Sequence, residues 1–185
     1  FLPEKQDLPE YERTGSTLFS FESQTPLREF DLIAFSIPFE EDYFNIPAIL
    51  KLSGVPLRSG ERNGPMIAAG GVAIGLNPEP LAEFIDFFII GDAEGAAAAI
   101  IDMLVDCRSK GLGKHELLKA LDSIDCVYVP SFYEFEYDGI HVKSVKVIEG
   151  AKKTVRASKA FDLDKFPVPQ SFVYTPRTEL PDTYC

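Results

Sequence analysis

Histidine, cysteine and tryptophan are scarce in this chain of 185 residues, which has two histidines, three cysteines and no tryptophan. The cysteines, Cys107, Cys126 and Cys185, are far apart and odd in number, which fits neither a disulfide framework nor a closed metal site. Neither His115 nor His141 has a serine or cysteine partner at a spacing that indicates a nucleophile and its base. We therefore expect the chain to carry no catalytic residues and no metal ligands of its own.

Basic clusters and long apolar runs are missing too. The chain has 18 Lys and Arg against 29 Asp and Glu, a formal net charge of −11. A nucleic-acid surface needs clustered positive charge, so no nucleic-acid partner is predicted. No apolar run approaches the roughly 20 residues that span a bilayer, and the amino end has neither the basic flank nor the apolar core of a signal peptide. We expect a cytoplasmic protein that does not bind membranes.

Nucleotide-binding signatures are also absent, because the sequence has neither a GxGxxG nor a Walker pattern. The chain has instead three short apolar runs, at 32–37, 66–69 and 86–90. Nearly continuous apolar runs of this length are typical of parallel strands that are covered on both faces. The second and third runs each end in a glycine loop.

Helical patterns lie between and after these runs. One helix is expected to begin near Asn45 and to end at Gly54, and another is expected at 77–85, where an Asn-Pro pair can open it. Two more are expected at 96–109 and 114–124. This alternation of strand and helix predicts an α/β fold with a doubly wound parallel sheet and helices on both faces.

The period changes in the last third of the chain. Residues 132–137 and 140–148 alternate apolar and polar side chains on either side of Asp138-Gly139, which predicts an antiparallel β-hairpin. Residues 154–160 are expected to add a third strand, and the proline-rich end is typical of an extended linker. The expected organisation is an α/β domain at 1–126, a hairpin extension at 127–161 and a linker at 162–185.

The glycine loops indicate a ligand-binding crevice, because the carboxyl ends of parallel strands form such crevices and glycine lets the backbone approach a ligand closely. The candidate binding residues share this position and are Ser36, Gly70, Gly71, Gly91, Asp92 and Glu94. A side chain added at Gly70 or Gly71 is expected to weaken ligand binding more than folding. The alternatives are that the glycines only form tight turns, that Asp92 and Glu94 cap the next helix, and that Ser36 satisfies loop amides.

Several stretches resemble one family. The matching stretches are LFSFES at 18–23, PLREFDLIAFSIPFE at 26–40, IAAGG at 67–71, NPEPLAEFID at 77–86, IIGDAEG at 89–95 and VYVPSFYE at 127–134. Together they resemble the amino-terminal, cobalamin-binding-like domain of a family of radical S-adenosylmethionine (radical SAM) proteins. The resemblance implies a flavodoxin-like, Rossmann-type parallel sheet with a corrinoid lying over the strand ends.

The same resemblance sets the expected cofactors and partner. The Asp-x-His-x-x-Gly signature, whose histidine ligates cobalt in methionine-synthase-like domains, is absent here, so cobalamin would bind without a protein histidine ligand. The Cys-x-x-x-Cys-x-x-Cys motif is absent too, which implies that the 4Fe-4S cluster and S-adenosylmethionine belong to a downstream radical SAM domain, the expected partner in the same protein. The chain is then expected to be the front part of a longer protein, lacking the first strand of its own domain.

Two functions remain open at this point. The first is an accessory domain of a radical SAM iron–sulfur oxidoreductase or transferase, which places a ligand or substrate near the catalytic domain. The second is a degenerate scaffold or interaction module that binds no cofactor. A free-standing flavodoxin-like hydrolase is the weakest reading, because the nucleophile and base are missing.

Overall fold

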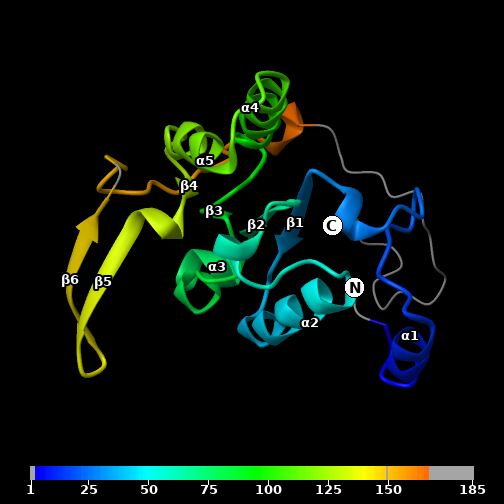
Figure 1. The fold of residues 1–185 in the computed structure, drawn as a ribbon. Coiled ribbons are helices and arrows are strands. Elements are labelled where there is room, and N and C mark those ends of the chain that lie inside the picture. The colour runs from blue at the N-terminus through cyan, green and yellow to red at the C-terminus, as the bar shows by residue number, and fades with distance from the viewer. Residues whose placement is uncertain (1–2, 149, 167–185) are drawn as a thin grey trace.

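The computed structural model of the chain, which describes residues 3–148 and 150–166, is built around a four-stranded sheet (Figure 1). The strands are β1 (Leu32–Ser36), β2 (Met66–Gly70), β3 (Phe87–Ile89) and β4 (Val127–Tyr128), in the order β1-β2-β3-β4. The first three are parallel, which confirms the prediction made from the apolar runs. The last strand is antiparallel to β3, so the sheet is mixed rather than purely parallel.

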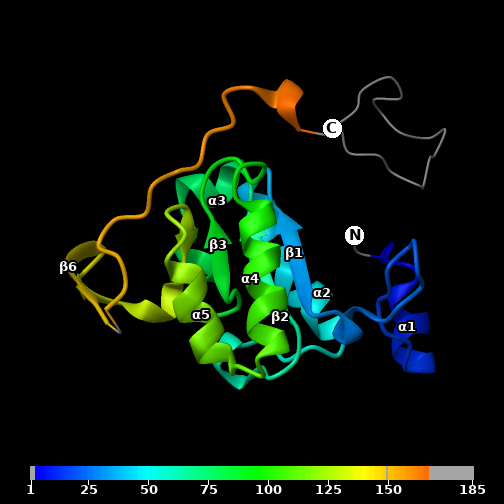
Figure 2. The same cartoon turned by 90° about the horizontal axis from the view of Figure 1, so that it is seen from above.

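Helices cover both faces of this sheet, as the strand–helix alternation predicts (Figure 2). The α-helices are α1 (Leu8–Thr14), α2 (Asn45–Leu52), α3 (Val72–Leu76), α4 (Ala97–Ser109) and α5 (Lys114–Asp122). One core cluster joins α2 and α3 to the sheet through Ile46, Leu50, Ile67, Ile74 and Phe88. The other joins α4 and α5 to the opposite face through Ala68, Phe87, Ile100, Leu118 and Leu121. The chain is therefore an α/β protein with two apolar layers.

Short 3₁₀ helices connect the main elements. They are η1 (Leu27–Glu29), η2 (Glu40–Phe44), η3 (Ser59–Glu61), η4 (Glu79–Leu81), η5 (Pro130–Phe132) and η6 (Leu163–Lys165). The helix expected at 77–85 is wrong, since only η4 forms there and the α-helix of this connection, α3, lies earlier. The amides of Leu81 and Ala82 bond three residues back, to the carbonyls of Pro78 and Glu79, which is the 3₁₀ pattern. Pro78 and Pro80 have no N–H with which to form α-helical bonds.

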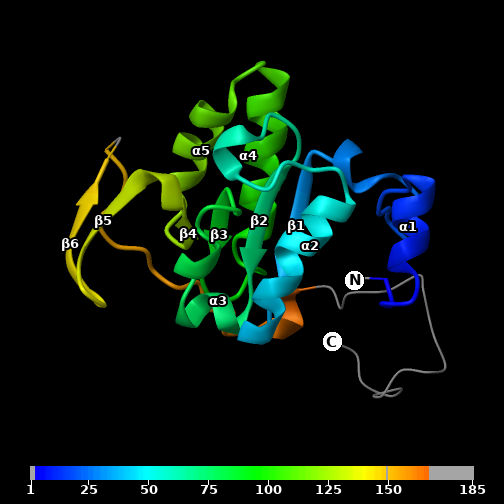
Figure 3. The same ribbon diagram turned by 60° about the horizontal axis from the view of Figure 1, so that its bottom comes forward.

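The first strand is less covered than its apolar sequence suggests. Ile33 is buried, but Ala34 and Ser36 on the other face are exposed. β1 is an edge strand, and the helices α4 and α5 pack over β2, β3 and β4 instead (Figure 3). The prediction that helices cover both faces of the strand is therefore wrong for β1. Its outer edge has no strand partner among the described residues.

The predicted hairpin is confirmed. β5 (Tyr133–Asp138) and β6 (His141–Val147) form a separate antiparallel pair that stands away from the four-stranded sheet (Figure 1). The third strand expected at 154–160 does not form, and this segment makes only one parallel bridge, between Ser158 and Gly91. Of the expected linker, residues 167–185 lie outside the described residues.

The described part of the chain contains no helix with the length and apolar character needed to cross a membrane.

Candidate functional site

Three of the candidate binding residues come together at the carboxyl ends of β1 and β2. Ser36 lies opposite Gly70 in the parallel register, and Gly71 follows directly. The amide of Ile37 donates to the carbonyl of Gly70 at 2.8 Å, which fixes the two strand ends against each other. Ser36 is exposed at this edge, while Gly70 and Gly71 are half-buried. The strand ends of β1 and β2 therefore present an accessible surface with little side chain on it.

Gly71 is required by the packing of the chain itself. Its φ of +108° lies in a region that residues with a side chain rarely adopt. A Cβ there would lie 2.6 to 2.9 Å from the backbone atoms of Ile37. The glycine therefore allows α3 to start against Ile37, whose carbonyl accepts a bond from the Ala73 amide at 3.2 Å. A side chain at Gly71 would therefore disturb folding directly, which contradicts the expectation for that position. At Gly70 a Cβ would lie 3.3 Å from the carbonyl oxygen of Ile89, and the expectation for Gly70 stays a prediction.

A segment from the far end of the chain covers the end of β3. Residues 155–160, here called the strap, run beside Gly91, whose φ is +89°. The amide of Ser158 donates to the carbonyl of Ile90 at 2.9 Å, and the amide of Asp92 donates to the carbonyl of Ser158 at 3.0 Å. A Cβ on Gly91 would overlap the Ser158 backbone. The strap thus occupies the space that a side chain at position 91 would need.

The two acidic candidates have different surroundings. The Oδ2 atom of Asp92 accepts a hydrogen bond from the amide of Ala160 at 2.8 Å, which ties the strap down at a second point. Glu94 is exposed. Helix α4 has no side-chain cap at its N-cap residue, Ala96. Both acids precede the positive end of this helix, so their electrostatic contribution there stays an open alternative.

The candidate residues therefore form two halves. The half at the ends of β1 and β2, with Ser36, Gly70 and Gly71, is not covered by the strap and is here called the open half. In the half that follows β3, the strap covers Gly91 and is hydrogen-bonded to Asp92.

Exposed apolar side chains lie in the segments that follow β1 and β2, the two strands of the open half. They are here called the apolar rim and are Phe39, Phe44, Val72 and Leu76, between 65% and 85% exposed. Tyr43 links the β1–α2 connection to α3, because its hydroxyl lies 2.9 Å from the carbonyl of Ala73 and 2.8 Å from the carbonyl of Asn77 and shares its one proton between them. Burial and the nearby charge of Glu40 raise the pKa of Tyr43.

The NPEPLA stretch is anchored to the last strand of the sheet. The hydroxyl of Tyr128 in β4 donates to the Oε1 atom of Glu79. Tyr128 also stacks on Phe88, with ring centroids 5.9 Å apart. Burial, followed by the hydrogen bond to Glu79, raises the pKa of Tyr128 well above its usual range. This contact joins two of the stretches that carry the family resemblance and fixes the loop behind α3.

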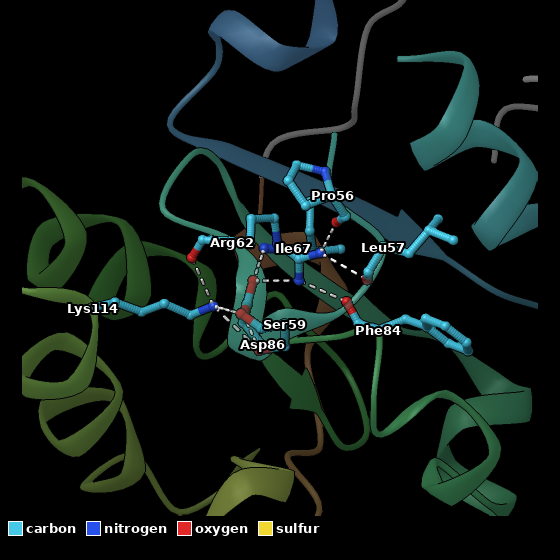
Figure 4. A network of polar contacts seen from close by, with 8 residues as sticks. All are labelled: Pro56, Leu57, Ser59, Arg62, Ile67, Phe84, Asp86 and Lys114. Atoms are coloured by element: carbon cyan, nitrogen blue, oxygen red, sulfur yellow. Dashed lines mark hydrogen bonds and ion pairs between the residues drawn. The ribbon is translucent and has the colours of Figure 1, made fainter. Parts of the chain in front are cut away.

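A buried polar cluster at the opposite end of the sheet was missed by the sequence reasoning (Figure 4). Asp86 precedes β3, and its Oδ1 atom accepts from Ser59 Oγ and pairs with Lys114 Nζ, both at 2.5 Å. Its Oδ2 atom accepts from Arg62 Nη2 at 3.0 Å and from the amide of Ile67 at 2.6 Å. The side chains of Arg62 and Asp86 are completely buried. This cluster lies at the amino ends of β2 and β3, away from the candidate site.

The sequence carried one signal for this cluster. An aspartate at the start of an otherwise apolar run has to find cationic or donor partners when the run is buried. Nothing in the local sequence around Arg62 or Lys114 identifies them as those partners. Among the described residues, no group of three or more His, Cys, Asp or Glu side chains is arranged to hold a metal ion.

Comparison with known proteins gives the family. The model for the amino-terminal region of radical SAM proteins matches residues 1–130. A Methanocaldococcus jannaschii protein named Uncharacterized protein MJ0966 is 34% identical over 89 residues, which are 48% of this chain and 19% of that protein. This chain thus matches less than a fifth of that relative's length, and no solved structure matches it. Because the family model covers well over half of the 185 residues, the chain belongs to the family of radical SAM proteins, as their N-terminal domain.

Proposed function

We propose that this chain is the accessory N-terminal domain of a radical SAM iron–sulfur enzyme, and that it holds a ligand or substrate beside the catalytic domain of the same protein. The observation that carries the proposal is the open surface at the strand ends of β1 and β2, in a chain of this family. The 4Fe-4S cluster and S-adenosylmethionine would belong to the catalytic domain. The parent protein would be an oxidoreductase or a transferase.

The finer fold that we propose is flavodoxin-like. β1, β2 and β3 lie side by side in chain order, and α2 and α3 pack on one face. Right-handed crossovers that step in one direction place their helices on one face in this way. In a flavodoxin-like sheet of order 2-1-3-4-5, the last three strands step in one direction, and the first strand lies beside the third. β1 would then be the third strand, and its open edge would be the place of the first.

The open edge of β1 supports this assignment. A groove of about 1150 Å³ borders the edge, and its lining includes Ala34 and Phe35 of β1 and Tyr11 of α1. In the flavodoxin-like order, ligands bind at the carboxyl end of the boundary between the first and third strands, where the strand order reverses. That boundary would lie beside Ser36.

Cobalamin is the ligand class that we propose for the open half. A corrinoid is large and flat, and it would rest on the exposed strand end at Ser36 and the half-buried backbone at Gly70, with the apolar rim available for further contact. A Cβ on Gly70 would lie 3.3 Å from the carbonyl oxygen of Ile89, so the backbone is approached there from the β3 side by the chain itself. The described residues include no histidine at these strand ends, so the cobalt would have no protein histidine ligand. Gly91 and Asp92 would contribute only if the strap moved, because their contacts are already made within the chain.

The strap favours a second candidate function. Gly71 and Gly91 are both explained by close approaches of the chain to itself. In such a domain the backbone, and not a cofactor, occupies the space beside these glycines, so the domain can serve as a scaffold without any cofactor. The two functions differ in one measurable property, the binding of a corrinoid by the full-length protein.

Replacing Ser36 by tryptophan is expected to weaken corrinoid binding by the full-length protein at least tenfold, because an indole at this strand end would occupy the surface that the ring needs. Ser109→Trp at the end of α4 is the matched control and should leave the affinity unchanged, since it lies on an exposed helix end. Titration with hydroxocobalamin, followed by absorbance and calorimetry, measures both. No binding by the unsubstituted full-length protein would rule out the cofactor role and leave the scaffold.

The 185-residue chain alone is expected to take up no iron–sulfur cluster in anaerobic reconstitution with iron and sulfide. Such clusters are held by thiolates, and Cys107 and Cys126 are buried in separate places. Iron and sulfide analysis of the reconstituted chain measures the result, with the full-length protein as the positive control. Four iron and four sulfide per chain in the short protein would contradict the division of labour proposed here.

A further inference from the structure

The two faces of the β5–β6 hairpin differ in chemistry. The register pairs Tyr133 with Val147, Phe135 with Val145 and Tyr137 with Val142, and these six side chains are here called the apolar hairpin face. Directly opposed residues of an antiparallel pair project to the same side. The other face carries the ion pairs Glu134–Lys146 at 2.9 Å and Glu136–Lys143 at 2.5 Å. The hairpin is therefore built to bury one side and expose the other.

Nothing among the described residues covers the outer part of the apolar hairpin face. Tyr133 and Val147 at the base are half-buried, and Tyr133 packs against the core of the domain. Tyr137, Val142 and Val145 farther out are 49% to 57% exposed. The hairpin stands clear of the sheet and its helices in all three views (Figures 1, 2 and 3). A two-stranded hairpin with one open apolar face is marginally stable by itself, so a covering surface is expected.

We infer that the apolar hairpin face docks on the polypeptide that follows this N-terminal domain in the same protein. This inference rests on the proposed function. The hairpin comes directly after residues 1–130, the part that the family model matches. The match to the M. jannaschii relative covers 19% of that protein, which is therefore much longer than the matched stretch. The occupant is thus a mostly apolar surface of the protein's own remaining part.

The area of the apolar hairpin face favours a surface of the same protein over a second copy of the chain. Three half-exposed side chains and two better-buried aromatic rings present on the order of 400 Å². A stable complex of separate molecules buries roughly 800 Å² on each partner. A face of half that size suffices when a covalent connection supplies a high effective concentration, as it does within one chain.

The charges of the hairpin also favour an occupant from the same protein. On the polar hairpin face, two glutamates are neutralised by two lysines, and the apolar face has no charge. Asp138 at the turn leaves the hairpin with one unbalanced formal charge, so it offers little electrostatic steering to a separate partner, although the chain as a whole has a net charge of −11. Apolar, uncharged contacts are typical of permanent interfaces.

Thiol protection in the full-length protein tests the inference. Val145→Cys places a thiol on the apolar hairpin face, and Ser144→Cys places one on the polar face one residue away; both positions are exposed in the domain alone. Reaction with a maleimide under native conditions, followed by mass spectrometry of the hairpin peptide, gives the rate at each site. We expect the thiol at 145 to react at least tenfold more slowly than the thiol at 144, at every protein concentration.

Two outcomes would overturn the inference. Rates within about threefold of each other would mean that the face is open. Protection that disappears on dilution would assign the face to a second copy. Val142→Cys paired with Lys143→Cys repeats the comparison nearer the turn, in case one substitution disturbs the hairpin. The maleimide reaction rates do not depend on a cluster or cofactor. The docking inference can therefore fail while the proposed function holds, and the proposed function can fail while the docking inference holds.

Discussion

Asp86→Ala is expected to lower the free energy of unfolding by about 3–5 kcal/mol, because it leaves a completely buried guanidinium without its counter-charge. Arg62 would still donate to the carbonyls of Pro56 at 2.8 Å and Phe84 at 2.7 Å, but these neutral acceptors do not balance its charge. The amide of Ile67 would lose its acceptor as well. Urea denaturation of the 185-residue chain measures the change.

The matched control is Glu83→Ala. Its partner Arg58 lies 2.9 Å away, but both side chains are more than 60% exposed, so the pair contributes only about 0–1 kcal/mol. Arg62→Met combined with Asp86→Leu removes both charges of the buried pair and should restore part of the stability lost in Asp86→Ala. The recovery is incomplete because Lys114 and the amide of Ile67 still lose the carboxylate. Equal effects of Asp86→Ala and Glu83→Ala would show that the cluster is not the buried centre described here.

Gly71→Val is expected to lower the free energy of unfolding by more than about 3 kcal/mol. Two costs add: a β-branched residue at a φ of +108°, and the overlap of its Cβ with the backbone of Ile37. Since Gly71 lies at the start of α3, the substitution should loosen the junction between β1 and this helix. Thermal or urea unfolding followed by circular dichroism measures the loss.

Gly75→Ala is the control for Gly71→Val. Gly75 lies within α3, and nothing lies within 4 Å of the position that a Cβ would take. Alanine there should stabilise the chain by about 0.5–1 kcal/mol, because it favours the helix. If Gly71→Val left stability intact, the close approach to Ile37 would be wrong, and the position would again be a clean probe of ligand binding.

Local sequence determined most of the secondary structure. The apolar runs predicted the positions of β1, β2 and β3. For β2 and β3 the reason is that a strand covered on both faces has to be apolar along its length, whereas β1 is apolar although one of its faces is partly exposed. The Asp138-Gly139 turn and the alternation on either side of it gave the hairpin, because a period of two is the signature of a half-buried strand. These features depend on residues close together in the chain, which is why the sequence alone reveals them.

Tertiary structure decided how the candidate site is divided. Gly91 and Ser158 are far apart in the sequence, and their bridge consists of backbone hydrogen bonds that leave no mark on residue type. The same is true of Arg62, whose carboxylate partner follows 24 positions later. Apolar periodicity records which side chains are buried, but not which distant segment buries them. The open half at Ser36 and the strap over Gly91 therefore emerge only when the chain is folded.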